Sequence, residues 1–203
     1  MISIPKSLDF LIEDNTREVC DFYMKLLKFK NKHIYTHSCQ VANYAASIAA
    51  KLGLDTKEIG CIKMSALLHD IGTLAVPNNI LDKYPYLSVR ENAAYRRHAA
   101  AGAAMLENLP EFSNIVHIIH NHHETWDGKG YPNHIKGNNI PIGARIVAVA
   151  DYYDANINPA TQNYRKPPEK ALKELKDKMG TLFDPEVVKA FMAVLPKPRN
   201  KKE

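Results

Sequence analysis

The sequence predicts an all-α fold in a single domain. Apolar residues recur at intervals of three and four along most of the 203-residue chain, which is the pattern of amphipathic helices. No stretch alternates between apolar and polar residues for long enough to indicate a strand. The length and the apolar fraction of 45% are those of a globular domain that buries its core without disulfides.

The expected helices follow from this spacing and from capping residues. One or two helices should end near residue 32, and a helix with Val41, Ala45 and Ile48 on one face should stop at Gly53. A helix beginning at Asp55 or Thr56 should run to residue 69. Further helices are expected over residues 88–106, 111–123, 142–155, 168–179 and 184–195. Loops are expected over residues 71–87 (with one short turn at most), 125–141 and 156–168.

The expected helix over residues 142–155 is apolar on most faces, which predicts a position in the middle of the domain. Asp151 lies within it. A buried carboxylate without a partner is costly. A metal ion, or an arginine such as Arg145, would offset that cost.

The positions of the imidazoles and carboxylates are more informative than their number. Taken singly, each has an ordinary explanation as a hydrogen-bonded core residue or a helix-end charge. Taken together, they come from separate helices or helix ends and suffice for two metal ions, with Asp70 able to bridge them. Mixed imidazole and carboxylate ligands suit iron, manganese, zinc or nickel better than magnesium or calcium. The set is His37, His69, Asp70, His98, His122, His123 and Asp151.

Composition excludes several classes of protein. The formal net charge is +5, but residues 197–203 hold +3 of it, with four basic residues against one acidic residue. The other basic residues are dispersed, so no binding of DNA or RNA is expected. No apolar run approaches the roughly 20 residues of a membrane span, and residues 1–10 lack the apolar stretch of a signal peptide. With three cysteines and no CxxC pair, a cytoplasmic protein is expected.

Two motifs carry a family resemblance. The first is His69-Asp70-Ile71-Gly72, after an apolar helix. The second and more specific motif begins with His122-His123-Glu124 and ends in the Gly-Tyr-Pro sequence of residues 130–132. Over residues 33–195 the chain resembles the HD-GYP branch of the HD superfamily of metal-dependent phosphohydrolases. Supporting matches are Pro77, His98 with Gly102, Asp151, Asp154 and Phe183-Asp184-Pro185.

The resemblance implies a helical bundle of the HD type with a central buried metal site. It implies a phosphodiesterase that hydrolyses cyclic di-GMP, or a related cyclic dinucleotide, through a metal-bridging hydroxide. The products would be the linear dinucleotide and, after a second round, GMP. Three parts are expected: an N-terminal helical extension packed on the core (1–32), the HD-GYP domain (33–196) and a basic flexible tail (197–203).

The resemblance also assigns roles to residues. The seven residues named above would be the ligands of two metals, iron or manganese in preference to zinc or nickel. A third metal near His33 would also fit, but a solvent-exposed histidine fits that position at least as well. Asp70, Glu124 and Lys83 are the expected catalytic residues, although Lys83 fits a solvated lysine nearly as well. Glu124, Asp127 and Asp154 could hold ligand imidazoles in one tautomer. The expected substrate-binding residues are Gly130, Tyr131, Pro132, Asp154 and Arg165.

Two departures from the family pattern leave an alternative open. Thr73 occupies the position where the family usually has a lysine near the scissile phosphate, and residues 156–165 differ from the usual arginine-rich segment. A catalytically weak sensor of cyclic dinucleotides, or a metal-containing interaction module, would therefore also fit. A homodimer or a signalling-protein partner is compatible with either reading. An HD nucleotidase acting on mononucleotides fits less well, because of the long Gly-Tyr-Pro loop.

Overall fold

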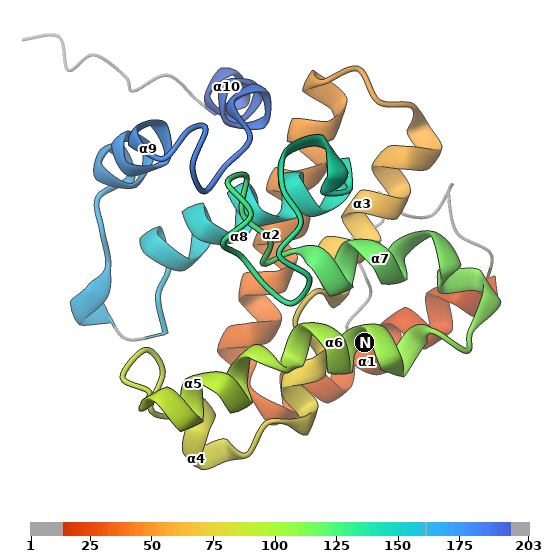
Figure 1. The fold of residues 1–203 in the computed structure, drawn as a ribbon. Helices are drawn as coiled ribbons and strands as arrows, with labels where there is room; N and C mark the ends of the chain where they lie inside the picture. The colour runs from red at the N-terminus through yellow and green to blue at the C-terminus, as the bar shows by residue number, and fades with distance from the viewer. Residues whose placement is uncertain (1–13, 161, 196–203) are drawn as a thin grey trace, which may run out of the picture.

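The computed structural model describes residues 14–160 and 162–195. In this part of the chain the regular elements are helices joined by turns and loops, with one isolated bridge between Met179 and Phe183. Figure 1 shows the arrangement. The helices are α1 (Asp14–Lys30), α2 (Lys32–Lys51), α3 (Thr56–Leu68), α4 (Asn78–Leu81), α5 (Val89–Arg96), α6 (His98–Leu106), α7 (Ser113–Asn121), α8 (Ile142–Ile157), α9 (Pro168–Asp177) and α10 (Pro185–Val194). Short 3-10 turns η2 to η5 lie at Ile71–Ala75, Pro110–Phe112, Gly137–Asn139 and Gln162–Tyr164.

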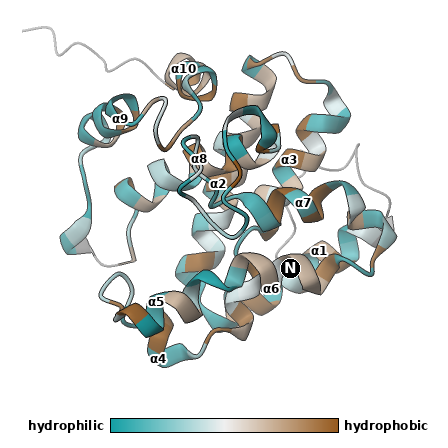
Figure 2. Ribbon diagram, in the orientation of Figure 1, coloured by the Kyte–Doolittle hydropathy of each residue, from teal (hydrophilic) through white to brown (hydrophobic). Residues whose placement is uncertain are grey.

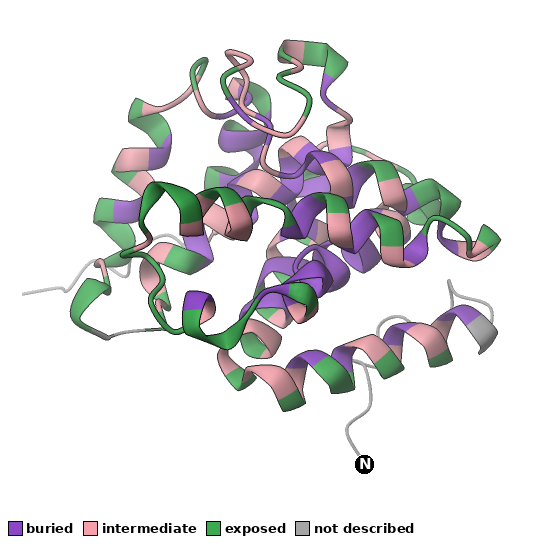
Figure 3. Cartoon of the chain, turned by 60° about the horizontal axis from the view of Figure 1, so that its bottom comes forward, coloured by how far each residue is buried: buried purple, intermediate pink, exposed green. Residues whose placement is uncertain are grey.

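Helices α2 and α8 form the centre of the bundle. Helix α2 packs against α1, α3, α8 and α10, while α7 packs against α3, α6 and α8. On α8, Ile146, Val147 and Val149 are fully buried, which confirms the prediction that this helix lies inside the domain. Figure 2 shows apolar and polar segments alternating along the outer helices, and Figure 3 shows buried residues concentrated in the inner ones.

Capping side chains set where the helices begin. The Asn31 side chain accepts hydrogen bonds from the backbone amides of His33 and Ile34, at 2.8 and 3.3 Å, and so starts α2 at Lys32. Asp55 and Ser88 each form a capping box at the start of α3 and α5. The early start of α2 places His33 and His37 one turn apart on the same helix.

Two glycines bring the His69-Asp70 turn against α6. A Cβ atom on Gly72 would lie 1.9 Å from the carbonyl oxygen of His98 and 2.5 Å from the amide nitrogen of Gly102. No side chain fits in that space, so glycine is required for η2 to pack on α6. The contact holds the backbone of Asp70 close to the backbone of His98.

Two details of the predicted helices were wrong. Residues 71–87 contain two short elements, η2 and α4, rather than one turn at most. The helix expected over residues 88–106 divides at Arg97 into α5 and α6, where the Arg97 amide bonds the carbonyl of Tyr95. Neither Gly nor Pro stands at that break, so the sequence carries no ordinary signal for it.

The N-terminal helix packs on the rest of the domain through Cys20, Met24 and Leu27, which are buried. The first thirteen residues and the predicted basic tail at 197–203 lie outside the described residues. The division of the chain into extension, main domain and tail stays a prediction. Among the described helices, none is both long and apolar enough to cross a membrane.

Candidate metal centre

Asp70 lies between two groups of imidazoles. One carboxylate oxygen, Oδ2, is 3.3 Å from Nε2 of His69, and the other, Oδ1, is 3.3 Å from Nε2 of His98. Asp70 is 8% exposed, and His69 and His98 are buried. Burial raises the pKa of Asp70, but the His69, His98 and His37 rings outweigh it and hold this pKa well below its ordinary value. The carboxylate is therefore ionised and presents one oxygen to each group.

The two groups hold donors at metal-binding distances. In each, one ligand atom per residue lies within 4.8 Å of the others. The groups are His37, His69 and Asp70, and His98, His122 and His123. Asp151 adjoins the first group through its 2.9 Å contact with His37. The structure thus brings together all seven residues that the sequence analysis proposed as ligands.

Three of the histidines are oriented by the same kind of hydrogen bond to a backbone carbonyl. Nδ1 of His69, His98 and His122 lies 2.8, 2.8 and 2.6 Å from a backbone carbonyl three residues earlier in the chain. A carbonyl oxygen can only accept, so Nδ1 carries the proton in each ring. In the neutral ring Nε2 then keeps its lone pair, and it is Nε2 that faces the centre. Such outer hydrogen bonds are typical of metal-binding histidines.

The second group, His98, His122 and His123, has the donor chemistry of a cation site. Nε2 of His98 is 3.4 Å from Nε2 of His122 and 3.1 Å from Nε2 of His123. Burial and the neighbouring His69 and His98 rings lower the pKa of His122 to about 3. Burial, with the His122 and His98 rings, holds the pKa of His123 well below its ordinary value. Neutral rings that direct lone pairs at one another are the arrangement that a divalent metal satisfies.

His37 is held differently, between two carboxylates. Its Nδ1 is 2.7 Å from Asp154 and its Nε2 is 2.9 Å from Asp151. Burial opposes a charge on this ring, but the hydrogen bonds with Asp151 and Asp154 prevail and raise the pKa of His37 to about 10. Asp154 is fully buried and also accepts from Asn158 at 2.8 Å.

The suggestion that Arg145 could balance Asp151 is wrong. The Arg145 guanidinium instead forms a 2.6 Å ion pair with Asp184 and donates to the carbonyl of Ile140 at 2.9 Å. Among the described residues, the cationic partner of Asp151 is the His37 ring. Arg145 therefore fastens the start of α8 to the start of α10.

The Gly-Tyr-Pro loop covers the second group. A Cβ on Gly130 would lie 2.4 Å from the Thr125 amide nitrogen and 2.5 Å from the carbonyl oxygen of His123, so only glycine allows this approach. The Tyr131 ring stacks on the His123 ring, with centroids 4.8 Å apart. Oε1 of Glu124 accepts from the Asn133 amide at 2.6 Å. Glu124 is thus bound to the far side of the loop.

Other predicted residues lie away from the donors. Lys83 forms a 2.6 Å ion pair with Glu91 on the surface. Asp127 bonds Thr125 and the amide of Lys129 within the loop, and contacts none of the ligand imidazoles. Thr73 is fully buried, and its hydroxyl donates to the carbonyl of Asp70. The proposed catalytic and substrate-binding roles of these and the other residues stay predictions.

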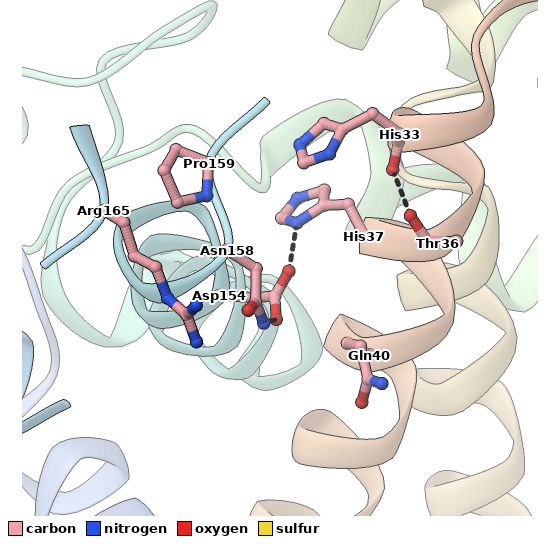
Figure 4. Close-up of a pocket in the computed structure, with 8 residues that line it drawn as sticks. All are labelled: His33, Thr36, His37, Gln40, Asp154, Asn158, Pro159 and Arg165. Atoms are coloured by element: carbon pink, nitrogen blue, oxygen red, sulfur yellow. Dashed lines mark hydrogen bonds and ion pairs between the residues drawn. The ribbon is translucent and has the colours of Figure 1, made fainter. Parts of the chain in front are cut away.

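A pocket of about 290 Å³ adjoins the His37 end of the centre (Figure 4). His33 and His37 reach into it from α2, and their rings stack with centroids 6.4 Å apart. Arg165 reaches it from the loop before α9. The pocket therefore brings together Arg165, Asp154 and His33, which the sequence analysis had linked to substrate or to a third metal. It is also lined by Thr36, Gln40, Asn158 and Pro159.

Two residues beside the centre were not singled out from the sequence. The Tyr95 ring contacts the His98 ring, with centroids 4.9 Å apart. The Arg96 guanidinium lies over the Tyr131 ring, 4.8 Å from its centroid. Tyr95 and Arg96 lie three and two residues before His98, at the end of α5. This closeness in sequence to a proposed metal ligand was the signal that could have indicated them.

Comparison with known proteins identifies the family of the chain. The HD domain family matches residues 21–187. A cyclic di-GMP phosphodiesterase of Thermotoga maritima is 35% identical over 182 residues, which is 89% of this chain and 50% of the relative. A 3'3'-cGAMP-specific phosphodiesterase 2 of Vibrio cholerae is 32% identical over 185 residues, 89% of this chain and 35% of the relative.

A solved structure with the HD fold also matches this chain. Bd1817, an HDG"Y"P protein from Bdellovibrio bacteriovorus, matches with a TM-score of 0.66 and 26% identity over 79% of this chain and 52% of that one. The chain belongs to the HD domain family, and its Gly-Tyr-Pro loop and these likenesses identify the HD-GYP branch. It spans about half the length of the Thermotoga relative and about a third of the Vibrio one.

Proposed function

We propose that this chain is a metal-dependent phosphodiesterase that hydrolyses cyclic di-GMP, or a related cyclic dinucleotide such as 3'3'-cGAMP. The observation that carries the proposal is the position of Asp70, whose two oxygens lie 3.3 Å from imidazoles of the two donor groups. A carboxylate shared in this way suits a site for two neighbouring divalent ions. The names of the Thermotoga and Vibrio relatives support the substrate class.

The seven donors would hold the ions: His37, His69, Asp70, His98, His122, His123 and Asp151. Two bound divalent ions would supply a water of lowered pKa and positive charge against the phosphate oxygens. We propose iron or manganese as the metal, as the resemblance to HD-GYP proteins implies; the mixed imidazole and carboxylate donors of the site are compatible with both.

The remaining residues orient the site and shield it. Asp154 fixes the His37 ring through Nδ1, and the carbonyls of Ala66, Tyr95 and Ile119 fix three others. Tyr131 covers His123 and limits the entry of water on that side. Glu124 holds the loop that carries Tyr131, so we treat it as a positioning residue.

The pocket beside His37 would hold one guanine base. Its volume of about 290 Å³ and its amide, hydroxyl and guanidinium groups suit a polar aromatic ring. An arginine can donate to both O6 and N7 of guanine, which gives Arg165 a role in base recognition. The reaction would release the linear dinucleotide, and a second round would release GMP.

Activity can be tested on protein loaded with iron or manganese without oxygen. Cyclic di-GMP and 3'3'-cGAMP are incubated with it, and chromatography follows the linear product. We expect turnover of at least one of them with the wild type and none with the matched Asp70→Asn variant. Failure of the metal-loaded wild type to hydrolyse any cyclic dinucleotide would refute the proposal. The same assay on zinc-loaded and nickel-loaded protein shows which metal supports turnover.

A second candidate is a cyclic-dinucleotide sensor with little or no turnover. Thr73 supports it, because the side chain at the position of the usual lysine is uncharged, buried and bonded to the Asp70 carbonyl. The Lys83–Glu91 ion pair supports it too, since it occupies another expected phosphate contact. Calorimetry distinguishes the candidates: a sensor binds the cyclic dinucleotide without releasing a linear product.

A further inference from the structure

Arg96 stands at the edge of the metal centre, on the last turn of α5. Its guanidinium lies over one face of the Tyr131 ring at 4.8 Å, and the Tyr131 ring stacks on His123 at 4.8 Å and 28°. Tyr131 therefore contacts both the exposed Arg96 and His123, a donor of the second group. Carboxylates Asp151 and Asp70 contribute to the raised pKa of Tyr131, after burial, which agrees with a ring that faces the centre.

The guanidinium of Arg96 contacts the Tyr131 ring but forms no ion pair among the described residues. In the same part of the chain, four other basic side chains do have carboxylate partners. These ion pairs are Lys83–Glu91, Lys129–Asp127, Arg145–Asp184 and Lys166–Glu174. Arg96 is exposed, so its guanidinium is accessible to an anion from solvent.

The ring beneath Arg96 prepares it for such an anion. A guanidinium held over an aromatic face is attracted by the ring and loses part of its side-chain freedom before any ligand binds. Its N–H groups remain available at the edge and can donate two parallel hydrogen bonds to a phosphate. Among the described residues, Arg96 contacts the Tyr131 ring and bonds none of the seven donors, so an anion at Arg96 can be distinct from one held among them.

A cyclic dinucleotide carries two phosphodiesters in one ring. If the first lies at the donors, as the proposed function requires, the second is displaced from them by the ring of the ligand. We infer that Arg96 binds this second, uncleaved phosphodiester. The site so defined takes a phosphate monoanion and supplies a free cation, which the uncharged Thr73 and the paired Lys83 do not. This inference rests on the proposed function and deepens it.

Two variants and a matched control test the inference. Arg96→Gln removes the charge, and Arg96→Lys keeps it but lacks the planar fork. Arg97→Gln is the control, because Arg97 is the next residue along, is exposed, and has the same charge. Circular dichroism and metal content should be the same in all of them. Arg165→Gln provides a comparison at the opposite end of the centre.

Binding is measured by calorimetry on manganese-loaded protein, with phosphorothioate analogues that resist hydrolysis. The two ligands are the cyclic di-GMP analogue, with two phosphodiesters, and the linear GpG analogue, with one. We expect Arg96→Gln to lower the affinity for the cyclic ligand by about tenfold or more, as for loss of a charged hydrogen bond. The affinity for the linear ligand should stay within about twofold of that of the wild type. The affinity of Arg96→Lys for the cyclic ligand should lie between those of Arg96→Gln and the wild type, and the affinity of Arg97→Gln should match that of the wild type.

Three results would overturn the inference. Equal losses for both ligands would mean that Arg96 only packs the loop. A selective loss in Arg165→Gln with none in Arg96→Gln would place the second phosphate at the other end. Absence of binding by the wild type would also reject it. By contrast, selective binding through Arg96 without turnover of cyclic di-GMP would reject only the proposed function.

Discussion

Backbone carbonyls orient His69 at one end of the metal centre and His98 and His122 at the other, but His37 and His123 are held by different means. At one end, His37 lies between the carboxylates Asp151 and Asp154. At the other, His98 and His122 are held by backbone carbonyls, and His123 by the stacked Tyr131 ring. The pKa values differ accordingly. Burial lowers the pKa of His37, but the hydrogen bonds with Asp151 and Asp154 outweigh it and raise this pKa to about 10, while burial and neighbouring imidazoles lower the pKa of His122 to about 3.

The comparison shows how one site can combine an anionic end with a neutral end. The carboxylate end attracts cations by charge, and the imidazole end selects them by the soft nitrogen donors that transition metals prefer. Asp70 belongs to both, so the ends are coupled through one residue.

Asp70→Asn should have the largest effect, because it removes the charge shared by both donor groups. We expect metal content, measured by mass spectrometry, to fall below that of the wild type at both ends. Activity should fall by more than the roughly 100-fold that loss of an outer hydrogen-bond partner costs. A variant that keeps full metal content would show that Asp70 is not the link between the groups.

Asp154→Asn should affect the His37 end alone. The neutral amide no longer holds Nδ1 of His37 as an anion does, so we expect metal affinity at one of the sites to fall by about 10- to 100-fold. Titration with Mn²⁺ should then show one weakened and one unchanged binding event. Asn158→Ala, which removes the 2.8 Å donor to Asp154, is the milder comparison. Two equally weakened events would contradict the separation of the ends.

Gly130→Ala should disturb the opposite end. The new Cβ meets three backbone atoms at 2.4 to 2.5 Å, so the loop must shift. We expect a loss of about 1–3 kcal/mol in the free energy of unfolding, as for overpacking, and weaker binding of the cyclic ligand. Mn²⁺ affinity at the His37 end should not change. Lys129→Ala, at the exposed neighbouring residue, is the control for general effects of loop substitution.

Lys83→Ala should have the smallest effect. Its ammonium is bound to Glu91 on the surface, and exposed ion pairs contribute little to stability. We expect nearly unchanged kcat, KM and unfolding midpoint. A large fall in kcat/KM with cyclic di-GMP would instead support the sequence-based prediction that Lys83 contacts phosphate, and would mean that it leaves Glu91 when substrate binds.

The helical fold and the donors were predictable because both depend on local patterns. His69 and His122 end apolar helices, and Asp151 interrupts an apolar one, so their burial follows from the spacing. His98 belonged to the same proposed set as a donor from a separate helix, and the family resemblance then implied its role as a ligand. The closeness of Asp70 to His98 depends on the packing of Gly72 against α6, which no single helix pattern contains.

Partners of charged side chains were the least predictable feature. Arg145 is six residues from Asp151, yet its partner is Asp184, brought near by the packing of α10 on α8. Lys83 and Glu91 pair across the connection between α4 and α5. A sequence shows which residues carry charge, but a pairing across helices is decided by how those helices pack.

The contact of Gly72 with α6 has a consequence for folding. Asp70 and His69 come from one segment, and His98 comes from another that reaches them only when α6 has docked on η2. A chain with α6 undocked therefore has the donors of one group without the link to the other. Uptake of a second metal ion should accordingly report the docking of α6 on η2, because it requires that close glycine contact to be complete.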